Sequence, residues 1–446
     1  MPSTSSVRIG SGAGFAGDRI GPAVELLASG ELDDMVLECL AERTVALGQL
    51  RRMHDADDGY DPMLVRRLTA MLPHAAASGA RLITNMGAAN PLAGGRAAQR
   101  VADELGIATR VAVITGDDAL DAIDHASPAL EDGRPIEAHG EVVSANAYLG
   151  ADAIVPALHS GATVVITGRV ADPSLFVAPL AQRFGWDLDN WSAMARGTLI
   201  GHLLECAGQV TGGYFADPGR KDVPGLARLG FPYASVTPDG RADISKIPGS
   251  GGMVTRATVR EQLLYEVTDP REYVTPDVRL DLTGVELATP GPDRVTVSGA
   301  RGRPRPAELK VSVGYRAGFR AEAEISYVGP NAAARARLAG EIVRERLTGT
   351  GIELRTDIFG SLEVDPSSRP AARDHECRLR VAALGSQQAA DDVCHEVEAL
   401  YTNGPAGGGG VRTATREVIG IVSTLVPREA VSPRVTHLGG TAHATA

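Results

Sequence analysis

Glu38 ends a short apolar run that starts at Met35, and Glu42 follows four residues later. If a helix begins directly after that run, both carboxylates face one cleft, because residues four apart share a helix side. Paired carboxylates in unequal environments provide one acid and one base in an active site. We therefore name Glu38 and Glu42 as acid–base candidates. The alternative is that Glu42 and Arg43 form ordinary surface and that Glu38 faces a ribose or water.

A glycine-rich segment follows the first apolar run of the chain. Gly12, Gly14 and Gly17 match the spacing of the dinucleotide-binding fingerprint, and Glu38 lies where that motif holds a ribose. Pro22 opposes this match, because the fingerprint helix begins within the glycines and would enclose the proline. A helix that starts at Pro22 instead leaves a longer loop, whose free N–H groups suit a phosphate or carboxylate. We expect the three glycines to bind substrate.

Two further loops carry polar side chains. Asp18, at the end of the glycine segment, is an acid–base candidate, although capping its own loop is the commoner role. Asn85 and Asn90 flank the loop after the apolar run Arg81–Thr84. Amides in such a place orient a carbonyl or stabilise an oxyanion, or else they shape the turn. We name Asn85 as an oxyanion donor and Asn90 as a substrate-binding residue.

Arg169 follows the apolar run Thr163–Thr167 with one glycine between them. The planar fork of a guanidinium binds two oxygen atoms at once, so an arginine there suits a carboxylate or phosphate. We predict that Arg169 clamps the anionic group of a substrate. Asp172 stands directly before Pro173, a pattern that is typical of a helix N-cap.

His202, Glu205 and Cys206 are spaced so that a helix places all three on one face. Such a trio suits a general base with its orienting carboxylate, a nucleophile, or part of a metal site. No further histidine or aspartate stands at ligand spacing, so we predict no metal site. We name His202 as an acid–base candidate. The alternative is a buried histidine whose hydrogen bonds stay within the protein.

Apolar runs and helical segments alternate in the first part of the chain, and most of the candidate residues follow a predicted strand. Alternation at this spacing is typical of β-α-β units, which form a mostly parallel sheet with helices on both faces. Right-handed crossovers bring the strand-to-helix loops to one edge, so we expect the candidates to converge there. The predicted strands are Val7–Ile9, Met35–Glu38, Arg81–Thr84, Val111–Thr115 and Thr163–Thr167.

The second half of the chain has a different pattern. Leu309–Val313 and Ala323–Tyr327 alternate apolar with polar residues, which indicates antiparallel pairing. A predicted helix over Asn331–Leu347, a strand over Cys377–Ala383 and a helix over Ala389–Leu400 complete an α+β unit. We therefore predict an α/β domain over residues 1–200 and an α+β domain over residues 201–446.

Composition excludes several classes of protein. The net charge of -11 and an aromatic content of 4% oppose nucleic-acid binding, which needs a basic face or stacking platforms. The four cysteines are scattered, so we predict neither a disulfide framework nor a structural zinc site. No signal peptide and no bilayer-spanning run is recognisable, which predicts a cytoplasmic protein that does not enter membranes. Oligomer statistics predict a homo-oligomer.

Several of these segments together resemble the bacterial acyclic terpene utilisation family. The resemblance covers roughly residues 7–427 and implies a role in degrading citronellol- and geraniol-type compounds through coenzyme A thioesters. Family members sometimes carry a further small domain, so the resemblance also implies a possible small partner subunit. The segments are Arg8–Arg19, Glu38–Arg43, Thr84–Pro91, Thr167–Arg169, Gly201–Cys206, Gln209–Gly213, Glu261–Tyr265 and Asp269–Pro270.

The leading hypothesis is an enzyme that needs no cofactor and acts on a branched acyl thioester or related carboxylate. Hydration, dehydration or carbon–carbon lyase chemistry needs an acid–base pair and an oxyanion site, and the loops supply residues for both. One alternative is a nicotinamide-dependent oxidoreductase that uses the glycine segment. Another is a subunit without catalysis whose glycine loops merely hold a thioester.

Overall fold

The computed structural model describes residues 6–360 and 376–439. Within that part the chain forms two compact units. Unit 1 takes residues up to Pro135, residues 143–313 and residues from Ile421 onward, whereas unit 2 takes residues 136–142 and 314–420. The predicted boundary near residue 200 falls inside unit 1, within helix α7 (Trp191–Leu204).

Unit 1 is built on one ten-stranded sheet. In sheet order its strands are β11 (Glu286–Gly291), β12 (Arg294–Ser298), β8 (Ala242–Lys246), β7 (Pro232–Val236), β1 (Val7–Ala13), β2 (Asp34–Leu37), β3 (Arg81–Thr84), β6 (Val164–Thr167), β4 (Val111–Thr115) and β18 (Arg434–Leu438). The predicted strands of the first part are all present, and β3 and β4 begin and end at the predicted residues.

The sheet is mixed, so the prediction of a mostly parallel sheet is wrong in that detail. Strands β1, β2, β3, β6 and β4 pair in parallel, as β-α-β units require. Strands β7, β8, β12 and β11 extend the β1 edge in antiparallel fashion, and β18 closes the β4 edge likewise. Short turns, such as the one between β7 and β8, can join only antiparallel neighbours.

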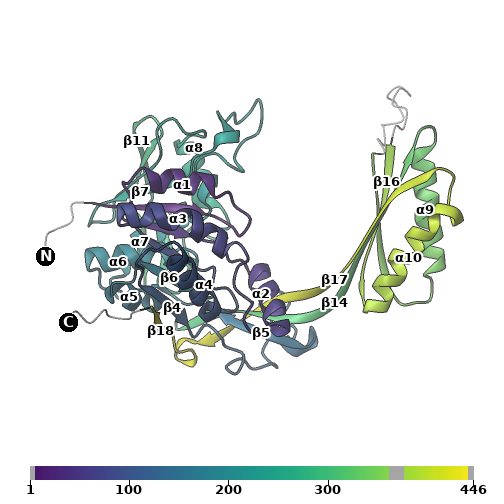
Figure 1. Ribbon diagram of the computed structural model, residues 1–446, viewed down its shortest axis with the longest axis horizontal. Helices are drawn as coiled ribbons and strands as arrows, with labels where there is room; N and C mark the ends of the chain where they lie inside the picture. Colours follow the sequence, from purple (N-terminus) through teal and green to yellow (C-terminus); the bar gives the residue numbers. More distant parts are fainter. Residues whose placement is uncertain (1–5, 361–375, 440–446) are drawn as a thin grey trace. The chain divides into compact units, whose positions relative to one another are not determined.

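Helices cover both faces of the parallel centre, as predicted. Met35 and Leu37 of β2 belong to one apolar cluster with Leu68 of α3, whereas the buried Val36 between them points to the other face. Helices α1, α3 and α4 pack together, and α5, α6 and α7 form a second group that contacts β1, β2, β4 and β6 (Figure 1). The helices are α1 (Gly21–Ala28), α2 (Glu42–His54), α3 (Leu64–Ser78), α4 (Pro91–Glu104), α5 (Ala151–His159), α6 (Ser174–Phe184), α7 and α8 (Arg256–Leu264).

Helix α1 starts at Gly21 with Pro22 in its first turn, as the proline predicted. Gly12 lies inside strand β1, and Gly17 lies in the loop before the helix. The glycine segment therefore does not enter a helix as the dinucleotide fingerprint requires. A small sheet of β13 (Arg301–Arg303), β10 (Arg279–Asp281) and β9 (Tyr273–Val274) adds to unit 1.

Unit 2 is an α+β unit built on strands β15 (Glu353–Phe359), β16 (Glu376–Gly385), β14 (Glu308–Val328) and β17 (Gly408–Pro427). Strand β5 (Val142–Ala147) pairs with β14 and belongs to unit 1 from residue 143 onward. Helices α9 (Ala332–Arg346) and α10 (Gln387–Asn403) pack on β16 and on each other (Figure 1). The predicted strand and helices of this region are confirmed. The predicted antiparallel pairing is confirmed for Ala323–Tyr327, which pairs with β16, and Leu309–Val313 lies on the same long strand β14.

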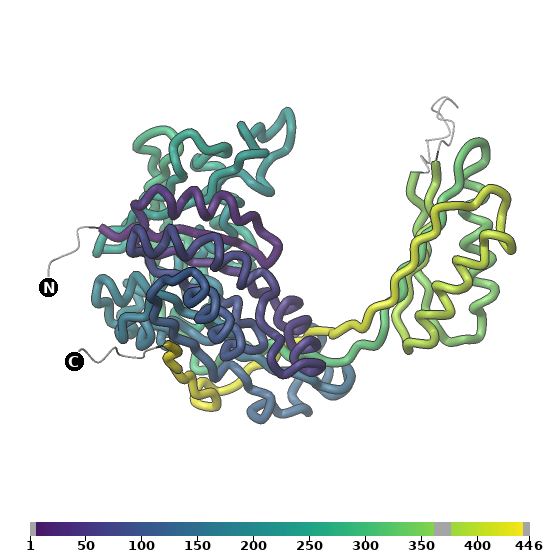
Figure 2. The backbone as a smooth tube through the Cα atoms, in the orientation of Figure 1, coloured from purple at the N-terminus to yellow at the C-terminus, as the bar shows by residue number. Residues whose placement is uncertain are grey.

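Strands β14 and β17 belong to both units and run side by side, as the green and yellow tubes of Figure 2 show. The part of β14 up to Val313 lies in unit 1, and the part of β17 from Ile421 returns to it. Residues of unit 1 thus come from both sides of the insertion that forms unit 2.

Gly14 lies so close to Cys206 that a Cβ atom on it would stand 2.7 Å from the Cys206 Cα. Gly14→Ala should lower the free energy of unfolding by about 1–3 kcal/mol, since backbone must move to admit the methyl group. Urea denaturation measures the change. Gly21→Ala is the matched control, because nothing lies within 4 Å of its added Cβ. Equal stability of the two variants would contradict this packing.

Candidate functional site

The loops after β1, β2 and β6 converge on one cavity of about 1100 Å³, and every residue that lines it belongs to unit 1. Gly14, Glu38 and Arg169 each follow the carboxyl end of one of these parallel strands. Ligands of open α/β sheets bind at this edge. The predicted convergence of the strand-to-helix loops therefore holds for these three loops.

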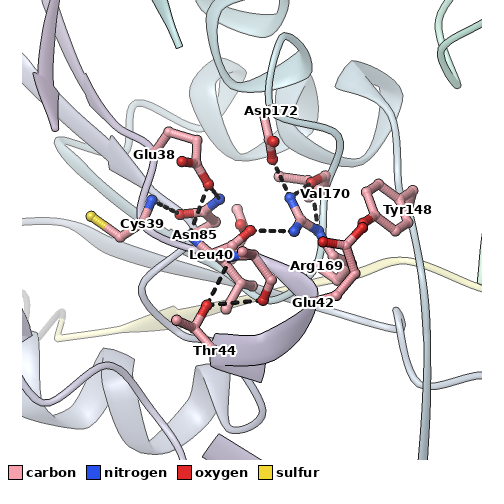
Figure 3. A network of polar contacts seen from close by, with 12 residues as sticks. Glu38, Cys39, Leu40, Glu42, Thr44, Asn85, Tyr148, Arg169, Val170 and Asp172 are labelled. Atoms are coloured by element: carbon pink, nitrogen blue, oxygen red, sulfur yellow. Dashed lines mark hydrogen bonds and ion pairs between the residues drawn. The ribbon is translucent and has the colours of Figure 1, made fainter. Parts of the chain in front are cut away.

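Glu38 lines the cavity while almost its whole side chain is buried. Its Oε1 accepts hydrogen bonds from the Leu40 N–H at 2.8 Å and from Asn85 Nδ2 at 3.0 Å (Figure 3). Burial raises the pKa of Glu38 to about 8, the Asp172 carboxylate adds to this shift, and the Arg169 guanidinium opposes it. Burial at this position therefore favours the protonated carboxylic acid over the carboxylate.

Asn85 lies behind Glu38 and does not line the cavity. Its Nδ2 donates to Glu38, and its Oδ1 accepts from the Cys39 N–H at 2.8 Å (Figure 3). The side chain is fully buried. Asn85 thus positions the carboxyl group of Glu38. The sequence predicted an oxyanion donor, but the amide of Asn85 does not face the cavity.

Glu42 is the first residue of α2 and also lines the cavity. The Tyr148 hydroxyl donates to its Oε1, and the Lys310 ammonium lies 3.2 Å from the same atom. Burial opposes ionisation, but these partners outweigh it and lower the pKa of Glu42 to about 2. The two predicted carboxylates therefore differ as an acid–base pair does, although so weak a base is a poor proton acceptor.

Arg169 is buried and holds several chain segments together. Its guanidinium donates to the Leu40 carbonyl, to the Val170 carbonyl and to the Asp172 carboxylate (Figure 3). Its Cζ lies 4.5 Å from the centroid of the Tyr148 ring, a cation–π arrangement. Most N–H groups of the Arg169 guanidinium are therefore hydrogen-bonded within the protein. Arg169 stabilises the cavity wall and does not have the free N–H groups that the predicted substrate clamp requires.

The glycine loop is fixed by its own side chain. Asp18 accepts hydrogen bonds from the Gly14 N–H at 2.9 Å and from the Arg19 N–H at 2.8 Å, which is the capping role. Arg67 also stabilises this loop, because its guanidinium donates hydrogen bonds to the carbonyls of Ala16 and Asp18. Of the three glycines, only Gly14 lines the cavity; Gly12 and Gly17 do not.

Asn90 lies away from the cavity. It caps α4 by accepting from the Ala93 N–H, and its Nδ2 donates to the carbonyls of Ala56 and Asp58. These bonds explain its burial without a ligand. The structure therefore does not place Asn90 with the other substrate-binding candidates.

His202 lies behind the cavity wall, and Glu205 lines it. Nδ1 of His202 is 2.8 Å from Glu205 Oε1, and Nε2 is 3.2 Å from the Leu263 carbonyl. Burial disfavours the imidazolium, but the Glu205 carboxylate outweighs it and raises the pKa of His202. The prediction that a helix carries all three residues is wrong, because α7 ends at Leu204, Glu205 is its C-cap and Cys206 lies beyond it. The contact of Glu205 with His202 is present, with the carboxylate nearer to the cavity than the histidine.

Most of the remaining lining is apolar and extends to the exposed rim of the cavity, where Phe15 is 61% exposed. Large exposed apolar side chains around a pocket mark a binding surface. The cavity thus suits a ligand with a bulky hydrocarbon part. Apolar lining residues include Leu130, Leu226, Leu229, Phe231, Val274 and Leu425.

Comparison with known families decides what kind of protein has this cavity. Residues 7–437 match the family model described as acyclic terpene utilisation family protein AtuA. The chain belongs to this family. The AtuA match confirms the resemblance drawn from the sequence and gives the protein a role in acyclic terpene utilisation. No curated protein and no solved structure matches the chain.

The cavity also contains residues that the sequence did not single out. Tyr148 follows β5, and Lys310 lies on β14; the Tyr148 N–H donates to the Lys310 carbonyl at 2.9 Å, which brings the two side chains to Glu42. Neither residue belongs to a motif, so only the strand pairing reveals them.

Residues 6–360 and 376–439 contain no cluster of three or more histidine, cysteine or acidic side chains arranged to hold a metal ion. In the same ranges no helix has the length and apolar character needed to cross a bilayer.

The raised pKa of Glu38 predicts a specific dependence of stability on pH. The folded state keeps a proton that the unfolded state releases above pH 4.5, so wild-type stability falls between pH 4.5 and about 8. Each pH unit in that window costs up to about 1.4 kcal/mol. Glu38→Gln should remove this loss, measured as urea denaturation between pH 5 and 8. Wild type and variant whose free energies of unfolding change equally with pH would contradict the prediction. Glu104→Gln, at an exposed position, is the control.

Arg169→Lys should destabilise the protein without any ligand present. Lysine keeps the charge but lacks the planar fork, so the free energy of unfolding should fall by about 2–4 kcal/mol. Thermal and urea denaturation measure the loss, with Arg43→Lys on the exposed rim as the control. A substrate clamp would instead leave the stability of the unliganded protein unchanged.

Proposed function

We propose that this AtuA protein adds water to, or removes water from, a branched acyl thioester or related carboxylate, with Glu38 as the proton donor. The observation that carries the proposal is a buried carboxylic acid, protonated at neutral pH, on the wall of a largely apolar cavity. Acids with raised pKa values in clefts are typical of proton-transfer sites. The hydrocarbon part of a terpenoid ligand matches the apolar lining.

Removal of water needs one proton delivered and one proton taken. Glu38 gives its proton to the hydroxyl oxygen while the carbon–oxygen bond breaks, and water leaves. A base takes the proton from the neighbouring carbon, and the electron pair of that carbon–hydrogen bond becomes the new double bond. Addition of water is the reverse of these steps. Since Asn85 and the Leu40 N–H hold Oε1, the proton of Glu38 is best carried by Oε2.

The substrate carbonyl needs a hydrogen-bond donor, because negative charge develops on its oxygen when the adjacent carbon loses a proton. Lys310 is the best candidate in the cavity. Its ammonium has three N–H groups, and Glu42 takes only one of them at 3.2 Å. In this proposal Glu42 stays ionised and holds Lys310 and Tyr148 in place, which replaces the proton-transfer role expected for it from the sequence.

Mass spectrometry tests the proposal with a branched 3-hydroxyacyl thioester and its 2-enoyl partner, each incubated with wild-type protein. The expected product differs from its substrate by one water. Glu38→Gln should lower kcat by about 100- to 10,000-fold with little effect on KM. The rate of water loss should fall as pH rises above about 8, where Glu38 loses its proton.

Glu104→Gln, on the exposed surface of α4, is the control and should react at the wild-type rate. Turnover of neither compound by wild-type protein would refute the proposal. Retained binding without turnover would instead favour a subunit that only holds the thioester, and a change of NADH fluorescence on mixing would favour the oxidoreductase alternative.

A further inference from the structure

Helix α7 ends at the cavity with a hydrogen-bonded pair that the chemistry of Glu38 does not use. His202 and Glu205 are both buried, and His202 Nδ1 lies 2.8 Å from Glu205 Oε1. The pair comes from a different element than Glu38, which follows β2, yet both carboxyl groups line the same cavity. The cavity therefore has two separate carboxyl groups with their own fixed partners.

The partners of His202 determine where its protons lie. The Leu263 carbonyl can only accept, so the imidazole Nε2 at 3.2 Å must carry a hydrogen. A neutral His202 therefore presents the lone pair of Nδ1 to Glu205, and a charged His202 donates to it. The pair shares one proton between Nδ1 and Oε1, and either partner can hold it.

Glu205 has one carboxylate oxygen without a hydrogen-bond partner in the part of the chain that the structure describes. Among the described residues, Oε2 of Glu205 has no hydrogen-bond partner although it is buried. Buried polar atoms are almost always paired, so an unpaired one in a cavity wall needs a reason. A group of the substrate, or a proton from it, supplies the missing partner.

The backbone around Glu205 is held in unusual conformations. Ala207, two residues later, has φ of +40°, and Glu266, which also lines the cavity, has φ of +59°. Neither is glycine, and strained residues of this kind gather at functional sites. Gln262 fixes the end of α7 by donating to the His202 carbonyl at 3.0 Å. These features fix the positions of His202 and Glu205 at the end of α7.

We propose that Glu205 is the second proton-transfer group of the cavity, and that His202 is a positioning residue behind it. Glu205 takes the proton from the substrate carbon next to the carbonyl. The carbon–hydrogen bond breaks, its electron pair passes to the carbonyl oxygen as an enolate, and the proton forms an O–H bond on Glu205. The substrate is thereby a carbonyl compound with an acidic neighbouring C–H. This inference rests on the proposed function for the identity of the acid, Glu38.

The charges around Glu205 agree with this role. Burial raises the pKa of Glu205 to about 7, the His202 partner opposes the shift, and the carboxylates of Asp172 and Glu266 add to it. The other titratable groups that face it are Tyr273 and Cys206, whose pKa values are also raised by burial. A base that changes state near neutral pH accepts protons far better than Glu42 does.

Hydrogen–deuterium exchange tests the inference without any loss of water. The probe is a saturated branched thioester, 3-methylbutanoyl-N-acetylcysteamine, which has no hydroxyl group to lose. Wild-type protein in D₂O should exchange the hydrogen next to the carbonyl, measured by mass spectrometry. Glu205→Gln should lower that rate at least about 100-fold, whereas Glu104→Gln, on the exposed surface of α4, should exchange at the wild-type rate. Glutamine preserves the contact with His202, because its amide donates to a neutral Nδ1.

His202→Gln separates a positioning role from a purely structural one. His202 lowers the pKa of Glu205, so its loss should move the midpoint of the exchange rate from near pH 7 to higher pH. A variant that merely loosened the fold would lower the rate at every pH without moving the midpoint. His159→Gln, on the exposed end of α5, is the matched control.

The outcomes distinguish this inference from the proposed function. Exchange that depends on Glu205 supports the inference even if no hydroxyacyl compound ever loses water. Exchange that survives in Glu205→Gln overturns it, and so does a wild-type protein that exchanges nothing while Glu38-dependent loss of water proceeds. Absence of both reactions overturns the inference and the proposed function together.

Discussion

The guanidinium of Arg169 is the contact on which the rest of the cavity depends. It joins the carbonyl of Leu40, in the loop after β2, to the carbonyl of Val170 and the carboxylate of Asp172, in the loop after β6. These two strands are not neighbours, because β3 lies between them. A buried cation that satisfies acceptors from both loops holds them at a fixed distance, and it also compensates the negative charge gathered there.

The carboxyl groups of the cavity have different neighbours, and these neighbours give each group a different tendency to hold a proton. Glu42 has a tyrosine hydroxyl and an ammonium group beside it and stays ionised. Glu38 accepts only two neutral N–H groups and remains protonated at neutral pH. Glu205 shares a proton with an imidazole. Three glutamates in one cavity thus reach three different protonation behaviours through their neighbours alone.

Periodicity and turn residues were enough to predict the parallel centre of the fold, because β3 and β4 are apolar runs bounded by glycine or arginine and Pro22 marks a helix start. The antiparallel edges escaped prediction, since strand order depends on contacts between distant segments. Glu38 and Glu42 line one cavity as predicted, but not as residues of one helix face, because α2 begins only at Glu42 and Glu38 lies in the loop after β2. Asn85, Asn90 and Arg169 were recognised as polar residues after strands, but sequence cannot tell whether such a group faces a ligand or the protein.

Tyr148 and Lys310 were not predicted for a related reason. They are single residues far apart in the chain, and a backbone hydrogen bond between two strands brings them together. Contacts between distant segments also decide which of His202 and Glu205 lines the cavity. The sequence therefore indicated His202 as the acid–base candidate and Glu205 only as its partner. In the structure Glu205 lines the cavity, whereas His202 is buried behind it.

The insertion of unit 2 between Val313 and Ile421 has a consequence for the order of folding. Lys310 and Leu425 both line the cavity, yet residues 314–420 of unit 2 separate them along the chain. Strand β18, which closes one edge of the large sheet, comes later still and pairs with β4. Such distant contacts pay their loop-closure entropy before they gain stability, so they form slowly. The part of the cavity wall that contains Lys310 and Leu425 is therefore expected to form late in folding.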